Sequence, residues 1–387
     1  MSDRSLIFPA QEYRDRTAFL QQKIAQTGLD ALFLTEPADI FYVTGFLTRF
    51  WESPARPWFV VIPRSGDPVA VIPAIGAELM ARTWMPQIRT WDAPDPRDDG
   101  VSLLAEVLGD LVPEQGRIGL PMGLETHLRM PLADYSELCR RLAPRRFVDA
   151  TRVVQHVREV KSAAEIAKIR TSCAIAGRAF DAVPQIAGQG RPLDKVFRDF
   201  QVLLLEAGAD WVSYVAGGAG PDGYGDVISP AGPQPLQKGD VLMLDTGAVR
   251  EGYFCDFDRN FSIGTASDLA RRTHDALWQA TEDVLQTLRP GMLACDAHRM
   301  LCDGLTRHGA TPGGGRLGHG LGVTLTEWPS FTPLDRTELR EGMVLTLEPG
   351  AVTADGRILV HEENIVLRAD GPELLSPRAP HELPVIP

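Results

Sequence analysis

The sequence predicts an α+β fold of two domains, with a smaller α/β domain over residues 1–150 and a larger domain over residues 151–387. A chain of 387 residues exceeds what one hydrophobic core usually serves, so two domains are expected. Strand-like apolar runs alternate with helical patterns in the first domain. In the second domain, two stretches each hold a pair of apolar runs joined by a short polar turn, which is typical of a β-hairpin.

The composition excludes several classes of protein. The chain is 44% apolar and 23% charged, which is typical of a globular protein. Its formal net charge of −12 argues against nucleic-acid binding, which requires a basic face. No apolar stretch approaches the roughly 18 residues of a membrane span, and the first residues lack the pattern of a signal peptide. We therefore expect a cytoplasmic protein whose five cysteines are reduced.

The first domain is predicted to begin with a helix over about residues 9–28, where apolar residues recur near helical spacing. Four buried strands are expected after it, at residues 31–35, 58–62, 68–72 and 117–120. The loop at residues 48–58 is rich in tryptophan and arginine. We predict that Arg49, Trp51 and Arg56 of this loop bind substrate, since loops often carry function. The alternative is that its aromatic rings simply pack under a proline-rich loop.

The second domain is predicted to open with a long helix. Ser162 and Glu165 have the spacing of a capping box, so this helix should start directly after Ser162. Three more helices are expected, at residues 193–207, 267–288 and 291–309.

Residues 241–263 form the first predicted hairpin, with two apolar runs flanking a short polar interruption. If its turn is centred between Arg250 and Glu251, Asp245 and Asp256 lie directly opposite each other. Cross-strand Cβ atoms are about 4.5–5.5 Å apart. Two carboxylates this close repel each other, unless one is protonated or a cation lies between them.

Residues 344–367 form the second predicted hairpin. Asp355-Gly356 favours a type I′ turn, and folding about it sets Glu348 opposite Glu363. Between the two hairpins lies His319, flanked by glycines that leave room for an imidazole near a crowded centre.

A single acid in a strand usually lies on a solvated face. Four acids paired across two otherwise apolar hairpins are different, because burying a charge without a partner is costly. Together with one histidine, these acids predict a dinuclear metal site.

These motifs resemble those of the superfamily of creatinase, prolidase, aminopeptidase P and methionine aminopeptidase, and the chain is most similar to its Xaa-Pro peptidases. The resemblance implies a pita-bread fold for the second domain and a creatinase-like first domain. It rests on the spacing of Asp245 and Asp256 with the following Arg259, Gly-His-Gly-Leu-Gly around His319, Leu-Glu-Pro-Gly at Glu348, and Glu-Asn at Glu363. It implies that Asp245 binds one metal ion, that His319 and Glu348 bind the other, and that Asp256 and Glu363 bridge the two.

The resemblance also implies a metal-dependent hydrolase. Two divalent ions held about 3.5–4 Å apart would lower the pKa of a bridging water and polarise a carbonyl, so that hydroxide attacks an amide or related C–N bond. Glu348 is predicted to be both a ligand and the group that moves protons. An oxygen-rich shell with one imidazole suits Mn²⁺ best, with Co²⁺, Zn²⁺ and Fe²⁺ as alternatives.

The sequence departs from the superfamily on the substrate side. Peptidases of this class carry one histidine upstream of the first aspartate and another in a His-Glu-x-Pro motif. Residues 217–230 contain no histidine, and Thr326 takes the second position, where we expect it to contact substrate. A common arginine is replaced by His361, and a common threonine by Asp258. Since strand side chains alternate, His361 should share a face with Glu363, and Asp258 with Asp256.

His361 is predicted to take over the proton transfer or substrate anchoring of the absent histidines, because imidazole titrates near neutrality. The alternative is that it packs under the sheet or hydrogen-bonds Glu362.

The sequence therefore predicts a dinuclear hydrolase of Xaa-Pro peptides. One alternative is an enzyme for a small osmolyte-like substrate, similar to creatinase, ectoine hydrolase or a dimethylsulfoniopropionate lyase. Another is a binding protein with an inactive site, which the full set of ligand residues disfavours.

We predict a homodimer in which the loop at residues 48–58 lies near the metal site of the partner, as is common in this superfamily. Light scattering at micromolar concentration tests the dimer, and a monomer would contradict it. Trp51→Ala or Arg56→Ala should raise KM more than it lowers kcat, because the loop would act on binding and not on the metal chemistry.

Overall fold

The computed structural model describes residues 7–387. The six residues before them, part of the segment considered above for a signal peptide, lie outside the described residues. The chain divides into two compact units, one ending at Arg158 and the other spanning Glu159–Pro387. The helix α6 (Thr151–Arg158) thus belongs to the first unit, although the predicted boundary stood before it. The predicted two-domain α+β architecture is confirmed.

The first unit is built on a six-stranded sheet with the strand order β4-β3-β2-β1-β5-β6. Strand β2 is antiparallel to both of its neighbours, and the remaining pairs are parallel. The four predicted strands are present, and two more exposed strands, β4 and β6, extend the sheet at its edges. The strands are β1 (Ala31–Leu34), β2 (Phe59–Pro63), β3 (Val69–Pro73), β4 (Gln87–Trp91), β5 (Arg117–Leu120) and β6 (Arg146–Asp149).

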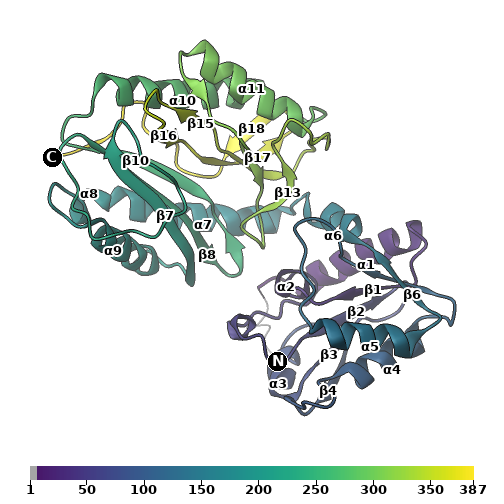
Figure 1. The fold of residues 1–387 in the computed structure, drawn as a ribbon. Coiled ribbons are helices and arrows are strands. Elements are labelled where there is room, and N and C mark those ends of the chain that lie inside the picture. The colour runs from purple at the N-terminus through teal and green to yellow at the C-terminus, as the bar shows by residue number, and fades with distance from the viewer. Residues whose placement is uncertain (1–6) are drawn as a thin grey trace. The chain divides into compact units, whose positions relative to one another are not determined.

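Helices cover both faces of this sheet (Figure 1). Helix α4 packs with α5 over an apolar core that includes Phe33, Phe59 and Leu104, while α1 packs with α6 and α2. The predicted first helix is confirmed as α1. The helices besides α6 are α1 (Ala10–Gln26), α2 (Pro37–Thr44), α3 (Ala77–Met80), α4 (Val101–Leu111) and α5 (Leu132–Leu142).

The second unit contains three sheets, and the candidate site lies on two of them. One has the order β19-β10-β8-β7, with β9 paired to β8, another has the order β13-β12-β14-β17-β18, and the third has the order β11-β15-β16. The strands of the first are β7 (Trp211–Pro221), β8 (Asp240–Arg250), β9 (Tyr253–Phe254), β10 (Phe257–Ile263) and β19 (Val385–Ile386). Those of the second are β12 (His319–Gly320), β13 (Glu327–Ser330), β14 (Val344–Leu347), β17 (Glu363–Arg368) and β18 (Gly371–Leu374). The third holds β11 (Thr311–Pro312), β15 (Gly350–Val352) and β16 (Ile358–Val360).

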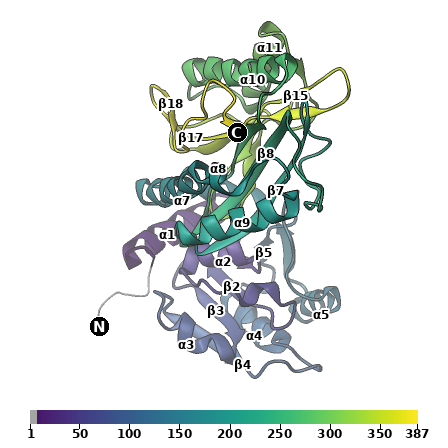
Figure 2. The same ribbon diagram turned by 90° about the vertical axis from the view of Figure 1, so that its left-hand side faces the viewer.

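Two groups of helices pack on these sheets. Helix α7 contacts β8 and α9, and α10 contacts α11, as Figure 2 shows for the upper part of this unit. The four predicted helices are all present. The helices are α7 (Ala163–Asp181), α8 (Val183–Ile186), α9 (Leu193–Glu206), α10 (Asp268–Thr287) and α11 (Ala294–Arg307). None of the helices in the described part of the chain is long and apolar enough to cross a membrane.

The capping box predicted at the start of α7 is confirmed. The Ser162 hydroxyl accepts the backbone N–H of Glu165, and the Glu165 carboxylate accepts the backbone N–H of Ser162 at 3.0 Å. Glu165 also accepts the hydroxyl of Tyr253 on β9 at 3.1 Å, so the cap fastens this helix to the first hairpin.

We expect Ser162→Ala to lower the free energy of unfolding by about 1 kcal/mol, because loss of the Ser162 hydroxyl leaves the backbone N–H of Glu165 without its acceptor. Chemical denaturation measures the change. Thr171→Ala, at an exposed site of the same helix, is the control and should change stability by less than about 0.5 kcal/mol. Equal effects of the two substitutions would contradict the stabilising role of the cap.

Candidate metal centre

The turn of the first hairpin lies one residue later than predicted. Arg250 pairs with Tyr253, so the loop consists of Glu251 and Gly252. Both have positive φ, 51° and 80°, as a type I′ turn requires. The predicted centre between Arg250 and Glu251 is therefore wrong, because glycine is the residue that most readily takes the second left-handed position.

This shift changes which acids face each other. Asp245 lies opposite Asp258, and Asp256 is its diagonal neighbour on the same face of the strand pair. The hydroxyl of Tyr214 on β7 lies between the two predicted ligands, within hydrogen-bond distance of Asp256 and 2.9 Å from Asp245 Oδ1. Burial raises the pKa of Asp245 well above its ordinary value, with the negative charges of Asp256 and Asp258 adding to the effect.

The second hairpin also differs from its prediction, here in the length of its loop. Its loop has three residues and not two: the N–H of Thr353 donates to the carbonyl of Arg357 at 2.8 Å, and Gly356 has a φ of 75°. Leu347 consequently pairs with Glu363, which sets Glu348 across from Glu362. A register shift of one residue exchanges the two faces of a strand, so the prediction that Glu348 faces Glu363 is wrong.

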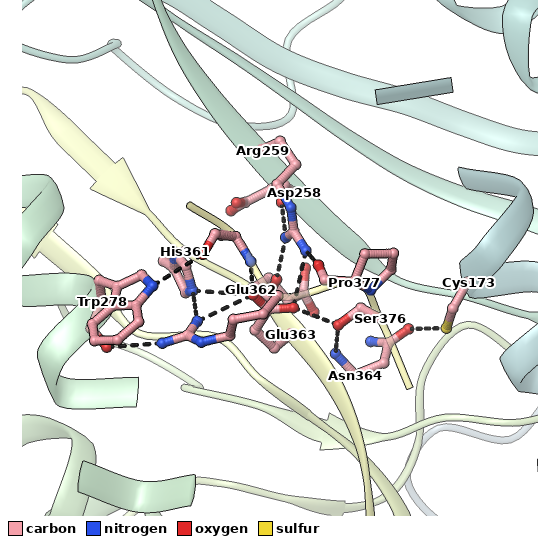
Figure 3. Close-up of polar contacts among 12 residues, drawn as sticks. Cys173, Asp258, Arg259, Trp278, His361, Glu362, Glu363, Asn364, Ser376 and Pro377 are labelled. Atoms are coloured by element: carbon pink, nitrogen blue, oxygen red, sulfur yellow. Dashed lines mark hydrogen bonds and ion pairs between the residues drawn. The ribbon is translucent and has the colours of Figure 1, made fainter. Parts of the chain in front are cut away.

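The Glu363 side chain is directed into a cluster of cations instead (Figure 3). It is fully buried, and it accepts Arg259 Nη2 at 3.0 Å, Arg378 Nη1 at 3.1 Å and the backbone N–H of Ala379 at 2.8 Å, besides the hydroxyl of Ser376. Burial by itself would raise the pKa of Glu363, but Arg259, His361 and Arg378 hold it well below its usual range. Its hydrogen-bonding capacity is thus occupied by protein donors.

His361 shares this face with Glu363, as the alternation of the strand requires, and therefore does not lie among the acids of Asp256 and Glu362. Its Nε2 lies 2.7 Å from Arg378 Nη1 and 3.5 Å from Glu363 Oε1. Burial lowers the pKa of His361 to about 4, although Glu363 opposes the shift. The assumption that His361 points into the site with Glu363 is wrong, and the packed alternative describes its position.

Glu362 takes the place expected of Glu363. One ligand atom each from Asp256, His319 and Glu362 lie within 4.8 Å of one another, and all three side chains are buried. Glu362 Oε1 has no hydrogen-bond partner among residues 7–387. Burial raises the pKa of Glu362, and the negative charges of Asp256 and Glu348 raise it further. A divalent cation would satisfy these acids, so the residues present fit the group.

His319 is oriented as a ligand. Its Nδ1 donates to the carbonyl of Gly320 at 2.7 Å, which leaves Nε2, 3.3 Å from Asp256 Oδ2, as the ring nitrogen available to a metal ion. The predicted role of the neighbouring glycines is confirmed. A Cβ on Gly318 would stand 2.3 Å from the carbonyl oxygen of Thr346, and one on Gly320 would stand 2.4 Å from that of Trp328.

Glu348 follows the end of β14 and is half-buried, as is Asp245. Burial raises the pKa of its carboxyl to about 7, with Asp256 adding and His319 opposing. This carboxyl can therefore take up and release a proton near neutrality.

Sequence reasoning missed three residues of the site, Tyr214, Glu362 and Asn364. The amide side chain of Asn364 accepts the backbone N–H of Asp256 at 2.9 Å and donates to its carbonyl, so it takes the place of a strand neighbour where β9 and β10 are interrupted. The adjacent acids Glu362 and Glu363 were the available signal, because two neighbours in a strand must face opposite ways.

The predicted substrate residue Thr326 lies in the turn before β13. Its backbone carbonyl accepts the hydroxyl of Thr324 at 2.9 Å. The next residue, Glu327, is buried, pairs with Lys161 Nζ at 3.0 Å and accepts the N–H of Val323 at 2.9 Å. This ion pair holds the turn in place.

The predicted substrate loop lies in the first unit, where its aromatic residues pack together. The rings of Trp51 and Trp58 are 5.6 Å apart, and both contact Phe46. Arg49 pairs with Glu52 at 3.0 Å at an exposed position. The loop borders a pocket of about 750 Å³, whose lining includes Trp51, Arg56, Trp58, Glu36, His127 and Arg129.

The fold and this site define a class: an α+β metallohydrolase with an oxygen-rich site that contains one imidazole. The chain belongs to metallopeptidase family M24, whose model matches residues 167–369. The creatinase/prolidase N-terminal domain matches residues 16–160. The predicted superfamily and pita-bread fold are confirmed, and family membership implies a metal-dependent hydrolase that uses divalent ions.

Relatives match along most of the chain. The probable dipeptidase PepE of Mycobacterium tuberculosis is 28% identical over 384 residues, which cover 98% of both chains. The Xaa-Pro dipeptidase of Pyrococcus horikoshii is 26% identical over 263 residues, covering 66% of this chain and 72% of that protein. The solved structure of dipeptidase PepE from Mycobacterium ulcerans has a TM-score of 0.84 at 28% identity, covering 98% of this chain and 99% of that one.

We expect His361→Gln to leave the pH dependence of kcat unchanged between about pH 6 and pH 8, because a ring with a pKa of about 4 stays neutral there. Glutamine can still accept from Arg378. Steady-state kinetics across this range measure the effect. Loss of an ionisation near neutrality in the variant would restore the proton-transfer role for His361.

Proposed function

We propose that this protein is a dinuclear metal-dependent dipeptidase that cleaves Xaa-Pro dipeptides. The proposed ligands are Asp245, Asp256, His319, Glu348 and Glu362, with Glu362 in place of the predicted Glu363. The observation that carries the proposal is the buried Glu362 carboxylate beside Asp256 and His319, whose Oε1 has no hydrogen-bond partner among residues 7–387. Ionised acids at this spacing repel one another unless a cation lies among them.

Two ions fit the number of donors, and Mn²⁺ fits their type. Bound there, such ions would polarise the substrate carbonyl and make water acidic. Glu348 is the proposed proton carrier: its half-buried carboxyl borders the acid cluster, where it can take the proton of the attacking water and pass it to the leaving amine. The Nδ1 of His319 is engaged by the Gly320 carbonyl, which leaves Nε2 as the ring nitrogen available to a metal ion.

The names of the relatives support a dipeptide substrate. The Mycobacterium tuberculosis protein that matches nearly the whole chain is called a probable dipeptidase, and a more partial match is called an Xaa-Pro dipeptidase. Thr326 stands where the His-Glu-x-Pro motif has its histidine, and we infer that it contacts substrate beside the turn held by Glu327. We retain Arg49, Trp51 and Arg56 as proposed substrate residues, supported by the pocket that Trp51 and Arg56 line. The homodimer and the cytoplasmic location also remain proposals.

We expect the wild-type protein, reconstituted with Mn²⁺, to hold about two ions per chain and to hydrolyse Xaa-Pro dipeptides. In Glu362→Gln, metal affinity and activity should both fall by at least the roughly 10- to 100-fold that follows substitution of a residue next to a metal ligand. Elemental analysis and a dipeptide hydrolysis assay measure the two quantities.

Glu363→Gln is the matched control. It removes one charge from the adjacent residue, weakens the contacts with Arg259 and Arg378, and should reduce stability more than metal content. Metal loss in Glu363→Gln together with retention in Glu362→Gln would contradict the assignment. Cleavage of small amides but of no dipeptide would transfer the function to the osmolyte-type alternative.

A further inference from the structure

Asp258 is a buried acid to which no side chain among the described residues donates a hydrogen bond. Asp258 is 2% exposed, and neither of its carboxylate oxygens has a hydrogen-bond partner of normal geometry among residues 7–387. The guanidinium of the next residue, Arg259, donates to the backbone carbonyl of Asp258 and to Glu363 instead. A carboxylate in this position is costly unless a cation neutralises it.

The position of Asp258 places it within the candidate metal centre. It lies directly opposite Asp245 in the strand register and two residues after Asp256, so all three acids share one face. Figure 3 shows Asp258 close to Glu362. Burial and the charges of Asp256 and Asp258 raise the pKa of Asp245, and Asp258 is also among the charges that raise the pKa of the buried Glu362.

We propose that Asp258 is an additional carboxylate ligand of the metal centre, on the side of Asp245, and that it favours Mn²⁺ over Zn²⁺. The inference rests on the proposed dinuclear site. A resident ion explains Asp258 better than a substrate ammonium, because the carboxylate is buried whether or not substrate is bound. Mn²⁺ accepts a six-coordinate, oxygen-rich shell, whereas Zn²⁺ in proteins is usually four-coordinate.

The test compares the affinities of the wild-type protein and its variants for Mn²⁺ and for Zn²⁺, measured by calorimetric titration of the metal-free protein. Asp258→Asn keeps the size and removes the charge, and Asp258→Thr introduces the residue common at this position in the superfamily. In both variants, Mn²⁺ should bind at least about tenfold more weakly, because substitutions of residues next to metal ligands already weaken binding by that factor. The preference for Mn²⁺ over Zn²⁺ should also fall. The rise in melting temperature caused by Mn²⁺ should shrink in parallel.

Asp240→Asn is the matched control. Asp240 is also buried on β8, but it accepts the N–H of Gln237 at 2.7 Å and lies about 16 Å along the strand from Asp245. Its substitution should leave both metal affinities unchanged. The threonine variant keeps the inference testable if the asparagine variant does not fold.

Three outcomes would overturn the inference. If Asp258→Asn and Asp258→Thr bind both metals as the wild type does, Asp258 is not a ligand, although the dinuclear site stands. If Asp258→Glu, which keeps the charge but moves it by one methylene, binds Mn²⁺ as the wild type does while Asp258→Asn does not, the role is general electrostatic attraction. If the wild-type protein binds neither metal, the proposed function fails as well.

Discussion

Repulsion among buried carboxylates is the constraint on which the catalytic unit depends. Each of these acids needs either a proton or a cation, because the low polarity of the interior disfavours an isolated charge. The fold meets this need in two ways on the two faces of one strand. Its acids are Asp245, Asp256, Asp258, Glu348, Glu362 and Glu363.

On one face of β17 the cations belong to the protein. Glu363 is held by Arg259 from the first hairpin and by Arg378 from the segment after β18, so its negative charge ties three distant parts of the chain together. Breaking such a buried pair leaves an uncompensated charge, which is strongly destabilising. On the other face, no donor from the part of the chain that the structure describes reaches Glu362 Oε1, and a bound metal would supply the missing charge. The structural acid and the metal-binding acid are thus neighbours in sequence and opposite in role.

Local sequence predicted much of this protein. Capping residues, helical spacing and apolar runs located the first helix, the four long helices of the second unit, four strands of the first sheet and the two hairpins, because these signals act over a few residues. The two hairpins and the glycines around His319 were also predicted. The registers were not. In the first hairpin the two-residue turn lies one residue later than predicted, which moves the strand pairing by two residues and keeps Asp245 and Asp256 on one face. In the second hairpin the turn has three residues and not two, which moves the pairing by one residue and reverses which of Glu362 and Glu363 faces the site.

The sequence by itself therefore determined the fold class, the acids and the histidine available to a metal, because residue type and spacing carry that information. Only the tertiary structure decided which of two adjacent glutamates faces His319, and that His361 packs beside Arg378. The physical reason is that facing depends on the pairing of strands and on partners far away in sequence. Arg259 and Arg378 contact Glu363 from more than a dozen residues away along the chain, and no local pattern around Glu363 predicts these contacts.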